Sequence, residues 1–374
     1  MAHVEDKRKG AAGYDGPKPW KARYRTPDGQ ARSRQFARKA DAERFLVKIE
    51  SDKMTGGFVD PSAGRTTFRR YAEEWRSTQV HRPTTVAQVA GHLHRHVYPR
   101  IGDRPLAAVR PSEIQALVKA LSVDLAPTTV ETIYRHVSSV FRSAVRDRLI
   151  VHTPCEGVKL PKANAGRIVP LELEQVEAVA VAMPDRWQAA VWLAAGTGLR
   201  QGEVLGLTAD RVDFLRRQVT VDRQMVTVVG SPPQFGPPKT QASYRTVPLP
   251  DSVAVALAEH MRHHPPGDDG LLFTTTDGEP VRRQRMADAW RRAAREAGLE
   301  EHTGFHALRH FYASLLIRHG ESVKVVQSRL GHASAAETLD TYSHLWPDSD
   351  DRTRVAVDEV LGASRVLPAS REAI

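Results

Sequence analysis

Hydrophobic and polar positions alternate near the N-terminus of the chain. Apolar and basic residues alternate over residues 20–25 and again over 31–36, which predicts two strands. A Pro-Asp-Gly turn signal at 27–29 separates them. Apolar positions then recur at helical spacing within residues 40–53. We therefore predict a small sheet-plus-helix module. We expect the first dozen residues, which are polar, to be disordered.

From residue 66 to about 158 the apolar positions follow a helical period instead. Pro83, Pro111 and Pro127 stand at the starts of three periodic segments, where proline is well tolerated. The predicted helices of this bundle are 67–75, 83–96, 111–121 and 127–148. A linker rich in Pro, Gly and Ser precedes the bundle at 60–65, and an extended linker follows it at 159–166.

Residues 167–374 combine helical and alternating patterns. The predicted helices are 172–182, 187–195, 252–263, 282–297, 306–319, 323–330 and 335–342. Alternation predicts strands at 219–229 and 245–249, with a turn rich in Gly and Pro at 230–238. The predicted fold class is therefore mainly α with small β-sheets (α+β): the N-terminal module, a helical bundle, and a mostly helical domain with one small antiparallel sheet.

Charge is distributed unevenly over the 374 residues. The net charge is +10, but residues 1–65 carry 15 Lys and Arg against 9 Asp and Glu, and residues 66–165 carry 15 against 8. The remaining residues carry 24 against 27. Because the N-terminal half holds the positive charge, nucleic acid is the natural partner. A solvated charged face is the alternative.

Cysteine content and hydropathy bear on the location of the protein. A single cysteine, Cys155, cannot form an internal disulfide, which fits a reducing cytoplasm. We find no apolar run typical of a signal peptide and no long uncharged apolar stretch. We therefore expect a cytoplasmic protein without a membrane partner.

Basic residues line the predicted N-terminal strands. One strand face carries Lys21, Arg23 and Arg25, and the partner strand carries Arg32 and Arg34. A basic sheet face can enter a DNA groove. Alternatively, the charges protect an exposed strand edge.

A second set of polar residues occurs in the C-terminal half in a fixed order. The segments are Gly198-Leu199-Arg200-Gln201-Gly202-Glu203, Pro238-Lys239-Thr240 with Ser243 and Arg245, Phe305-His306-Ala307-Leu308-Arg309-His310, Leu330-Gly331-His332, and Tyr342. Cleavage of a phosphodiester without metal requires a nucleophile, cations on the non-bridging oxygens, and a proton donor for the leaving oxygen. Arginine, lysine, histidine and tyrosine supply these functions.

Histidine spacing also raises the question of a metal site. His306 and His310 are four residues apart, but the glutamate of the metalloprotease pattern is absent between them. His92, His94 and His96 are interpreted as surface or DNA-backbone residues. We therefore predict no metal and no other cofactor.

The C-terminal motifs resemble those of the tyrosine recombinases, the integrases of temperate phages and related mobile elements. The resemblance implies that Tyr342 attacks a DNA phosphate and forms a 3′-phosphotyrosyl bond. It implies the following roles for the other residues: Arg200 and Arg309 hold the non-bridging oxygens, His332 donates a further hydrogen bond, Lys239 protonates the leaving 5′-oxygen, and His306 helps to deprotonate Tyr342. Glu203 is expected to orient a neighbouring cation, and His310 is expected to be structural.

The resemblance extends to the domain organisation. It implies an arm-type DNA-binding module at 1–62, a helical core-binding (SAM-like) domain at 66–158 and a catalytic domain with a C-terminal tail at 167–374. Apolar residues of the tail, between 355 and 361, either dock onto a neighbouring subunit or pack on their own domain.

The implied partners are core and arm attachment sites in double-stranded DNA, a homotetramer on that DNA, an excisionase-like directionality factor and a host DNA-bending protein. Two alternatives to a phage or prophage integrase stay open: a transposase of an integrative conjugative element, and a DNA-binding regulator without catalysis. The N-terminal module argues against a compact two-domain resolvase of dimers. The sequence also lacks the larger clamp that is typical of a type IB topoisomerase.

Overall fold

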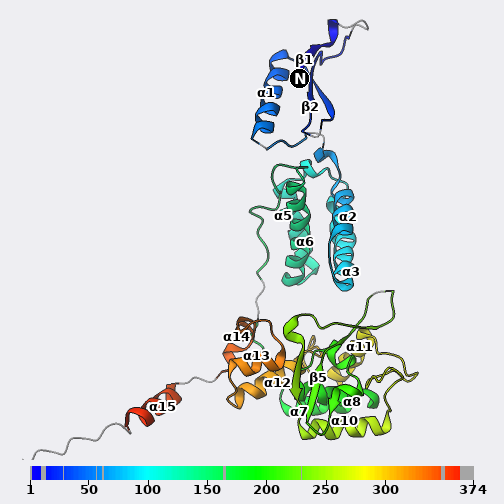
Figure 1. Ribbon diagram of the computed structural model, residues 1–374, viewed down its shortest axis with the longest axis vertical. Helices are drawn as coiled ribbons and strands as arrows, with labels where there is room; N and C mark the ends of the chain where they lie inside the picture. Colours follow the sequence, from blue (N-terminus) through cyan, green and yellow to red (C-terminus); the bar gives the residue numbers. More distant parts are fainter. Residues whose placement is uncertain are drawn as a thin grey trace, which may run out of the picture. The chain divides into compact units, whose positions relative to one another are not determined.

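The computed structural model describes residues 2–9, 14–27, 29–55, 57–60, 63–162, 166–228, 230–346 and 350–362 (Figure 1). The chain divides into two compact units, Met1–Asn164 and Ala165–Ile374. Helices predominate in both, with small antiparallel sheets, and the predicted fold class is confirmed. Within the described ranges, no helix is long and apolar enough to cross a membrane.

The N-terminal module is a three-stranded antiparallel sheet with one helix packed on it. Its elements are β1 (His3–Asp6), β2 (Trp20–Arg25), β3 (Ala31–Phe36) and α1 (Lys39–Met54), and the strand order is β1-β2-β3. Ala22 and Tyr24 of β2 are buried in one cluster with Leu46 and Ile49 of α1. This burial follows from the alternation of the strand and the helical period of residues 42–49.

The expectation of disorder at the N-terminus is wrong for β1. Residues 3–6 pair with β2, with Val4 opposite Ala22 and Glu5 opposite Lys21. Because β1 is only four residues long and mostly polar, its pairing depends on the free edge of β2 and not on its own pattern. Residues 10–13, and Asp28 of the predicted turn, lie outside the described residues.

The helical block follows the predicted segments closely. Its helices are α2 (Phe68–Thr78), α3 (Pro83–His92), α4 (Tyr98–Ile101), α5 (Pro111–Asp124) and α6 (Pro127–Arg146). A π-helical turn, Leu93–Val97, joins α3 to α4. Proline opens α3, α5 and α6 because its fixed φ suits the first turn, where its missing N–H is not needed.

Aromatic and aliphatic side chains fill the interior of this block. Phe68 of α2 and Phe141 of α6 are fully buried, with ring centroids 5.0 Å apart. Burial of such a side chain contributes about 1.5–3 kcal/mol. His92 and His96 are half-buried, and the His92 ring lies 5.4 Å from that of His136 on α6. Of the three histidines expected on the surface, only His94 is exposed, because α3 and the π-helical turn both pack against α6.

The second unit contains nine named helices in its described residues: α7 (Leu173–Ala182), α8 (Asp185–Thr197), α9 (Gln201–Leu205), α10 (Asp251–His263), α11 (Arg283–Glu296), α12 (Ala307–Arg318), α13 (Val323–Leu330), α14 (Ala335–Tyr342) and α15 (Asp350–Gly362). Helix α8 is largely buried and contacts α7, α10 and α12. Helix α13 contacts both α12 and α14 (Figure 1).

The strands of this unit differ from the prediction in three places. They are β4 (Val212–Asp213), β5 (Gln218–Val221), β6 (Gln224–Val226), β7 (Gln234–Gly236) and β8 (Arg245–Pro248). One antiparallel sheet has the order β4-β5-β8, and β6 and β7 form a separate pair. The described part of the predicted strand 219–229 is therefore two strands, and the predicted turn 230–238 contains β7. Strand β4 was not predicted.

The break between β5 and β6 falls at residues 222 and 223. Asp222 follows β5 directly, and its carboxylate binds Arg211 at 2.8 Å and Arg223 at 3.0 Å. These ion pairs are partly solvent-exposed. After them, β6 pairs with β7 and not with the first sheet.

Candidate active site

Arg200 is placed by a sharp end to helix α8. Gly198 has a φ of 66°, in the left-handed region, and a Cβ there would lie 2.4 Å from the ring of Tyr312. Only glycine fits this position. The chain then turns directly into α9, and Arg200 is the residue that precedes that helix. Gly198 thus positions the arginine.

Glu203 fixes the orientation of Arg200. Its carboxylate accepts a hydrogen bond from the backbone N–H of Arg200 at 2.9 Å and another from Nη1 of the same residue at 3.0 Å. The backbone bond caps the first turn of α9. Only 2% of the Glu203 side chain is exposed, against 27% of that of Arg200. The arginine therefore reaches solvent from a buried anchor.

Arg245, at the start of β8, completes this ion-pair network. Its Nη2 donates to Glu203 Oε2 at 2.8 Å, and its Nε donates to the carbonyl of Arg329 at 2.8 Å. Burial alone would raise the pKa of Glu203, but Arg245 and Arg200 outweigh it and hold the pKa below its usual value. Glu203 orients two cations, and the sequence pattern had indicated one.

Arg309 is almost completely buried and is held by backbone carbonyls. Only 1% of the residue is exposed. Its Nη1 donates to the carbonyl of Gly198 at 2.8 Å, and its Nη2 donates to the carbonyl of Leu330 at 2.6 Å. Burial, together with Arg200 and Arg245, lowers the pKa of Arg309 to about 9. The guanidinium therefore stays charged at neutral pH.

The Leu330-Gly331-His332 motif connects both arginines to a histidine. The carbonyl of Gly331 accepts a hydrogen bond from Arg200 Nη2 at 3.3 Å, next to the Leu330 carbonyl that binds Arg309. Gly331 has a φ of 64°, and a Cβ there would lie 2.9 Å from the carbonyl of Ala242. This glycine ends α13 in the left-handed conformation and delivers His332 beside the two arginines.

His332 and Tyr342 lie with their rings nearly parallel. The ring centroids are 6.4 Å apart with an interplanar angle of 12°. His332 Nδ1 is hydrogen-bonded to Thr338 Oγ1 at 2.8 Å, and this bond fixes the ring. Burial, followed by the positive charge of Arg309, lowers the pKa of His332 to about 4, so the imidazole is neutral at pH 7.

Tyr342, the last residue of α14, is 1% exposed. Its hydroxyl is 2.8 Å from His310 Nδ1. Burial raises the pKa of Tyr342 to about 12, against the opposing effect of Arg309 and Arg200. His310 was expected to be structural, but it contacts the phenol directly. The ring of His306 lies edge-on against that of His310, at 4.9 Å and 90°.

Lys239 lies in the loop between β7 and β8 and is exposed. The described residues provide no hydrogen bond or ion pair for its ammonium group. Its neighbour Thr240 shares a 2.9 Å hydrogen bond with Ser243, whose Oγ accepts from Arg200 Nη1 at 3.4 Å. The loop is therefore anchored next to the lysine, while the lysine itself is free to turn.

Two sequence models decide the family. The model of the Phage integrase family matches residues 170–348, and the model of the Phage integrase central domain matches residues 68–160. The chain belongs to the phage integrase family of tyrosine recombinases. It is accordingly a tyrosine-type site-specific recombinase, and the predictions of family and activity are confirmed.

Individual relatives agree with this assignment. The integrase is 29% identical over 341 residues to a putative prophage phiRv2 integrase of Mycobacterium tuberculosis, covering 87% of this chain and 88% of the relative. It is 27% identical over 326 residues to the integrase of Mycobacterium phage D29, covering 86% and 84%.

Solved structures share the fold. The Tn1549 transposon integrase in complex with transposon right end DNA matches with a TM-score of 0.67 and 22% identity, over 79% of this chain and 100% of that chain. A lambda integrase dimer bound to a COC′ core site matches with a TM-score of 0.60 and 17% identity, over 88% and 94%.

The five basic residues of the N-terminal sheet do not share one face in this integrase. Cross-strand partners lie on the same face of a sheet. Arg32 is opposite Tyr24 and Arg34 is opposite Ala22, on the face that packs against α1. Arg34 accordingly lies over the ring of Phe45 in α1 at 5.4 Å. Lys21, Arg23 and Arg25 occupy the other face, where Arg23 pairs with Glu5 at 2.6 Å.

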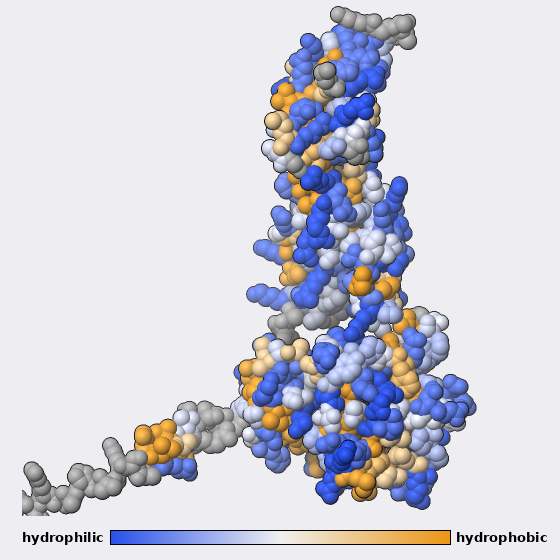
Figure 2. All heavy atoms as spheres, viewed as in Figure 1, coloured by the Kyte–Doolittle hydropathy of each residue, from blue (hydrophilic) through white to orange (hydrophobic). Residues whose placement is uncertain are grey.

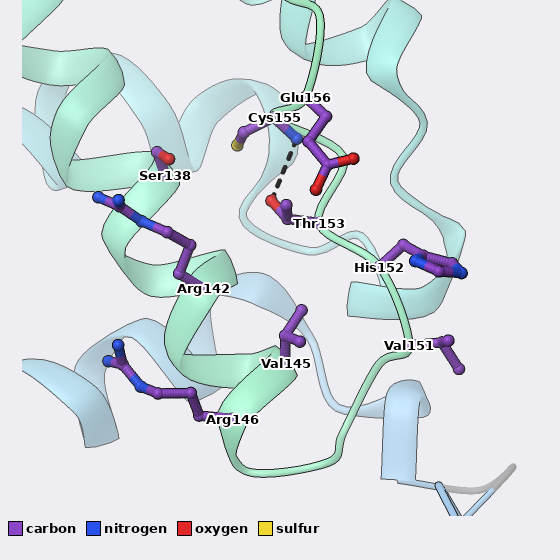
Figure 3. Close-up of a pocket in the computed structure, with 9 residues that line it drawn as sticks. All are labelled: Ser138, Arg142, Val145, Arg146, Val151, His152, Thr153, Cys155 and Glu156. Carbon is purple, nitrogen blue, oxygen red and sulfur yellow. Dashed lines mark hydrogen bonds between the residues drawn. The ribbon is translucent and has the colours of Figure 1, made fainter. Parts of the chain in front are cut away.

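A cavity of about 420 Å³ lies in the helical block and not at Tyr342 (Figure 3). Arg142 and Arg146, on successive turns of α6, flank it together with His152 and Cys155. Burial raises the pKa of the Cys155 thiol to about 11, so this thiol is protonated and unreactive at neutral pH. Within the described ranges, no three His, Cys, Asp or Glu side chains are grouped so that they could hold a metal ion.

The charges around Tyr342 suit an anion. Arg200, Arg245 and Arg309 are linked through the single carboxylate of Glu203 and through the carbonyls of residues 330 and 331. Three guanidinium groups and one carboxylate leave a positive site beside a buried phenol. A phosphodiester monoanion is complementary to this charge and to the fork geometry of arginine.

Proposed function

We propose that Tyr342 is the nucleophile of strand cleavage. It attacks a DNA phosphodiester and forms a 3′-phosphotyrosyl bond, which conserves the energy of the broken bond for rejoining without ATP or metal. The observation that carries this proposal is the run of residues 330–332. Two adjacent carbonyls of that run hold Arg309 and Arg200, and its histidine stacks on Tyr342.

The other side chains of the site are assigned to charge stabilisation, proton transfer and positioning. We infer that Arg200 and Arg309 stabilise the charge on the non-bridging oxygens and that His332 donates a further hydrogen bond from Nε2. Lys239 protonates the leaving 5′-oxygen. Glu203 holds Arg200 and Arg245 in place. His306 packs edge-on against His310 and acts on Tyr342 through that ring.

Covalent trapping tests the nucleophile. Wild-type protein and Tyr342→Phe are incubated without metal or ATP with nicked DNA drawn from a library of candidate attachment sequences. The expected result is an SDS-resistant adduct, at particular sequences, with the wild type alone. An equal adduct with Tyr342→Phe means that another residue attacks. If both proteins bind DNA and neither forms an adduct, either an accessory partner is missing from the assay or the chain is a DNA-binding regulator.

We propose the following domain boundaries: an arm-binding module at 1–62, a core-binding domain at 66–158, a linker at 159–166, and a catalytic domain with a C-terminal tail at 167–374. The two sequence models, at 68–160 and 170–348, support this division. So do the separate hydrophobic clusters of the three segments.

Double-stranded DNA is the proposed partner of the first two domains. In the arm-binding module, Lys21, Arg23 and Arg25 form the sheet face that faces away from α1 and therefore the face that can enter a groove. In the core-binding domain, Arg142 and Arg146 are exposed on α6 and suit phosphate contacts (Figure 3). The solved relatives are bound to transposon DNA and to a core site, which supports core contacts.

The assembly is proposed to be a homotetramer on DNA, as a lambda integrase tetramer on a Holliday junction has the same fold. An excisionase-like factor and a host DNA-bending protein would set direction, and the reaction would take place in the bacterial cytoplasm.

In Figure 2, hydrophobic side chains gather on α15. Val355, Val357, Val360 and Leu361 are all exposed there, so we propose that this helix docks onto a neighbouring subunit. Deletion of residues 350–374 is then expected to weaken cooperative assembly more than single-site binding, and unchanged cooperativity would contradict docking.

A transposase of an integrative conjugative element is the second candidate. It is favoured by the TM-score of 0.67 with the Tn1549 transposon integrase. The DNA recovered by trapping separates the two: a phage integrase selects an attachment core, and a transposase selects the ends of its element.

A further inference from the structure

The hydroxyl of Tyr342 is enclosed by its own subunit. Tyr342 is 1% exposed, and among the described residues its phenolic oxygen has one recorded hydrogen bond, to His310 Nδ1 at 2.8 Å. His310 belongs to α12 and Tyr342 to α14, so two elements of one chain form the contact. The ring centroids are 5.6 Å apart at 63°, which places the edge of the imidazole at the phenol.

Two other histidines lie near this pair, but neither replaces His310. His332 stacks on the Tyr342 ring, and its Nδ1 is already bonded to Thr338 Oγ1. Its Nε2 lies 3.8 Å from Glu337 Oε1 and has no recorded bond to the phenol. His306 contacts the ring of His310. Within the described residues, His310 is therefore the histidine whose nitrogen reaches the reacting oxygen.

The chemistry of attack requires a proton acceptor at this position. A phenol is a poor nucleophile until its proton leaves, and burial raises the pKa of Tyr342 to about 12. An acceptor within hydrogen-bond reach removes that obstacle. Burial and the charge of Arg309 lower the pKa of His310 to about 4, so its imidazole is neutral and has a lone pair available.

Resting on Tyr342 as the nucleophile, we propose that His310 is the general base of strand cleavage. As the Oη–P bond forms, the phenolic proton moves to Nδ1 of His310, and the bond between phosphorus and the 5′-oxygen breaks. Lys239 supplies the proton that the 5′-oxygen takes up. In the reverse step the imidazolium returns its proton to Tyr342. Oxidation states do not change, and no metal or further reactant is needed.

The arginines make the transfer possible only when DNA is bound. Without DNA, the positive charge of Arg309 opposes a second positive charge on His310. A bound phosphate adds a negative charge next to Arg309 and so favours the imidazolium. The proton therefore moves with bond formation, and the free protein keeps a neutral phenol beside a neutral imidazole.

The test measures single-turnover adduct formation on the DNA recovered by covalent trapping. The variants are His310→Ala, His310→Asn and His306→Ala. The asparagine substitution places an amide where Nδ1 stands and keeps a hydrogen bond to the phenol, but the amide cannot accept a proton. His319→Ala, an exposed histidine at the end of the same helix, is the matched control. Affinity for unnicked DNA and the thermal midpoint are measured for each protein.

We expect both substitutions of His310 to slow adduct formation by about 10²–10³-fold, the usual contribution of a general base. DNA affinity should stay within about twofold of the wild type, because His310 contacts Tyr342 and not the arginine side chains that hold phosphate. If His310→Asn keeps the wild-type rate while His310→Ala loses it, His310 only positions the phenol and the proposal is overturned. Wild-type rates in both variants overturn it as well.

A more acidic nucleophile supplies the second arm. Fluorinated tyrosine at position 342 loses its proton more readily and depends less on a base. The rate difference between wild type and His310→Ala should then shrink by about tenfold or more. The assignment is contradicted if fluorination leaves the rate difference between wild type and His310→Ala unchanged. It is also contradicted if fluorination shrinks only the rate difference between wild type and His306→Ala. Failure of the nucleophile itself is seen separately, as an adduct formed by Tyr342→Phe.

Discussion

The arginines and the lysine of the active site are held in opposite ways. Arg309 is buried and donates to two backbone carbonyls, and Arg200 and Arg245 share the Glu203 carboxylate. Lys239 is exposed on a loop, and the described residues give it no partner. The comparison teaches that charge stabilisation is preorganised in the protein, because fixed dipoles need no rearrangement as charge develops. Lys239, which we propose as the proton donor, is left for the DNA to place.

The largest expected effect comes from the buried half of this comparison. Arg309→Lys keeps the charge but cannot donate to the carbonyls of Gly198 and Leu330 together while holding phosphate. We expect single-turnover adduct formation to fall about 10³-fold. The measurement is adduct formation at saturating protein, with DNA affinity as the control. A loss below tenfold would show that charge alone suffices at this position.

The next effect concerns the anchor of the cluster. Glu203→Gln breaks a buried pair with Arg245 and should lower the free energy of unfolding by about 3 kcal/mol, or about 100-fold in the folding equilibrium. Because the pKa of Glu203 is lowered in the folded state, its contribution is full above the ordinary pKa of 4.5 and is lost as the pH falls through the lowered value. Denaturant titrations of both proteins at pH 7 and in acid test this. A difference that persists unchanged at low pH contradicts it.

The exposed half of the comparison predicts a smaller and more specific effect. Lys239→Ala should slow adduct formation about 10²-fold and leave the thermal midpoint unchanged, because the side chain has no partner in the described structure. A 5′-bridging phosphorothiolate at the cleavage site, whose thiolate leaves without a proton, should restore the rate. Lys324→Ala, an exposed lysine on α13, is the control. Absence of rescue would assign Lys239 another role.

The smallest predicted effect concerns Ser243, which contacts both the lysine loop and Arg200. Ser243 links Thr240, next to the lysine, to Arg200. Ser243→Ala should slow adduct formation about tenfold, the value of one such hydrogen bond. We expect this loss of rate to disappear on the phosphorothiolate substrate, which would show that Ser243 acts through the loop that carries Lys239. A loss that remains assigns the effect to Arg200. Ser231→Ala, in the neighbouring loop, is the control.

The helices were predictable because local signals agree there. Proline at the first position of α3, α5 and α6 coincides with the start of an apolar period, and both signals are local. The strands β1, β4 and β7, of four, two and three residues, were missed because such short segments pair only where a neighbouring strand offers an edge. Pairing also determined the faces of Arg32 and Arg34, which alternation within one strand cannot give.

The six candidate catalytic residues could be named from the order of their motifs, and their roles stay predictions. The contacts that position these residues could not be predicted from the sequence. Arg245 and Glu203 are 42 residues apart, and His310 and Tyr342 are 32 apart. His306 and His310 occupy the same helix face in the sequence pattern, and the packing of α14 against this region determines which of them meets the phenol. Tertiary packing, and not the local sequence, therefore determines which histidine contacts Tyr342.

The placement of several active-site residues depends on Gly331, a residue without a side chain. A single added methyl group would press against the Ala242 carbonyl and the Arg245 side chain, in a backbone conformation that other residues avoid. It would displace Arg200 and Arg309, which we propose bind phosphate, together with His332, while leaving every side chain of the site chemically intact. Inactivating changes in natural copies of such an element can therefore be silent in any inventory of catalytic residues, and an apparently complete set of motifs does not guarantee a working recombinase.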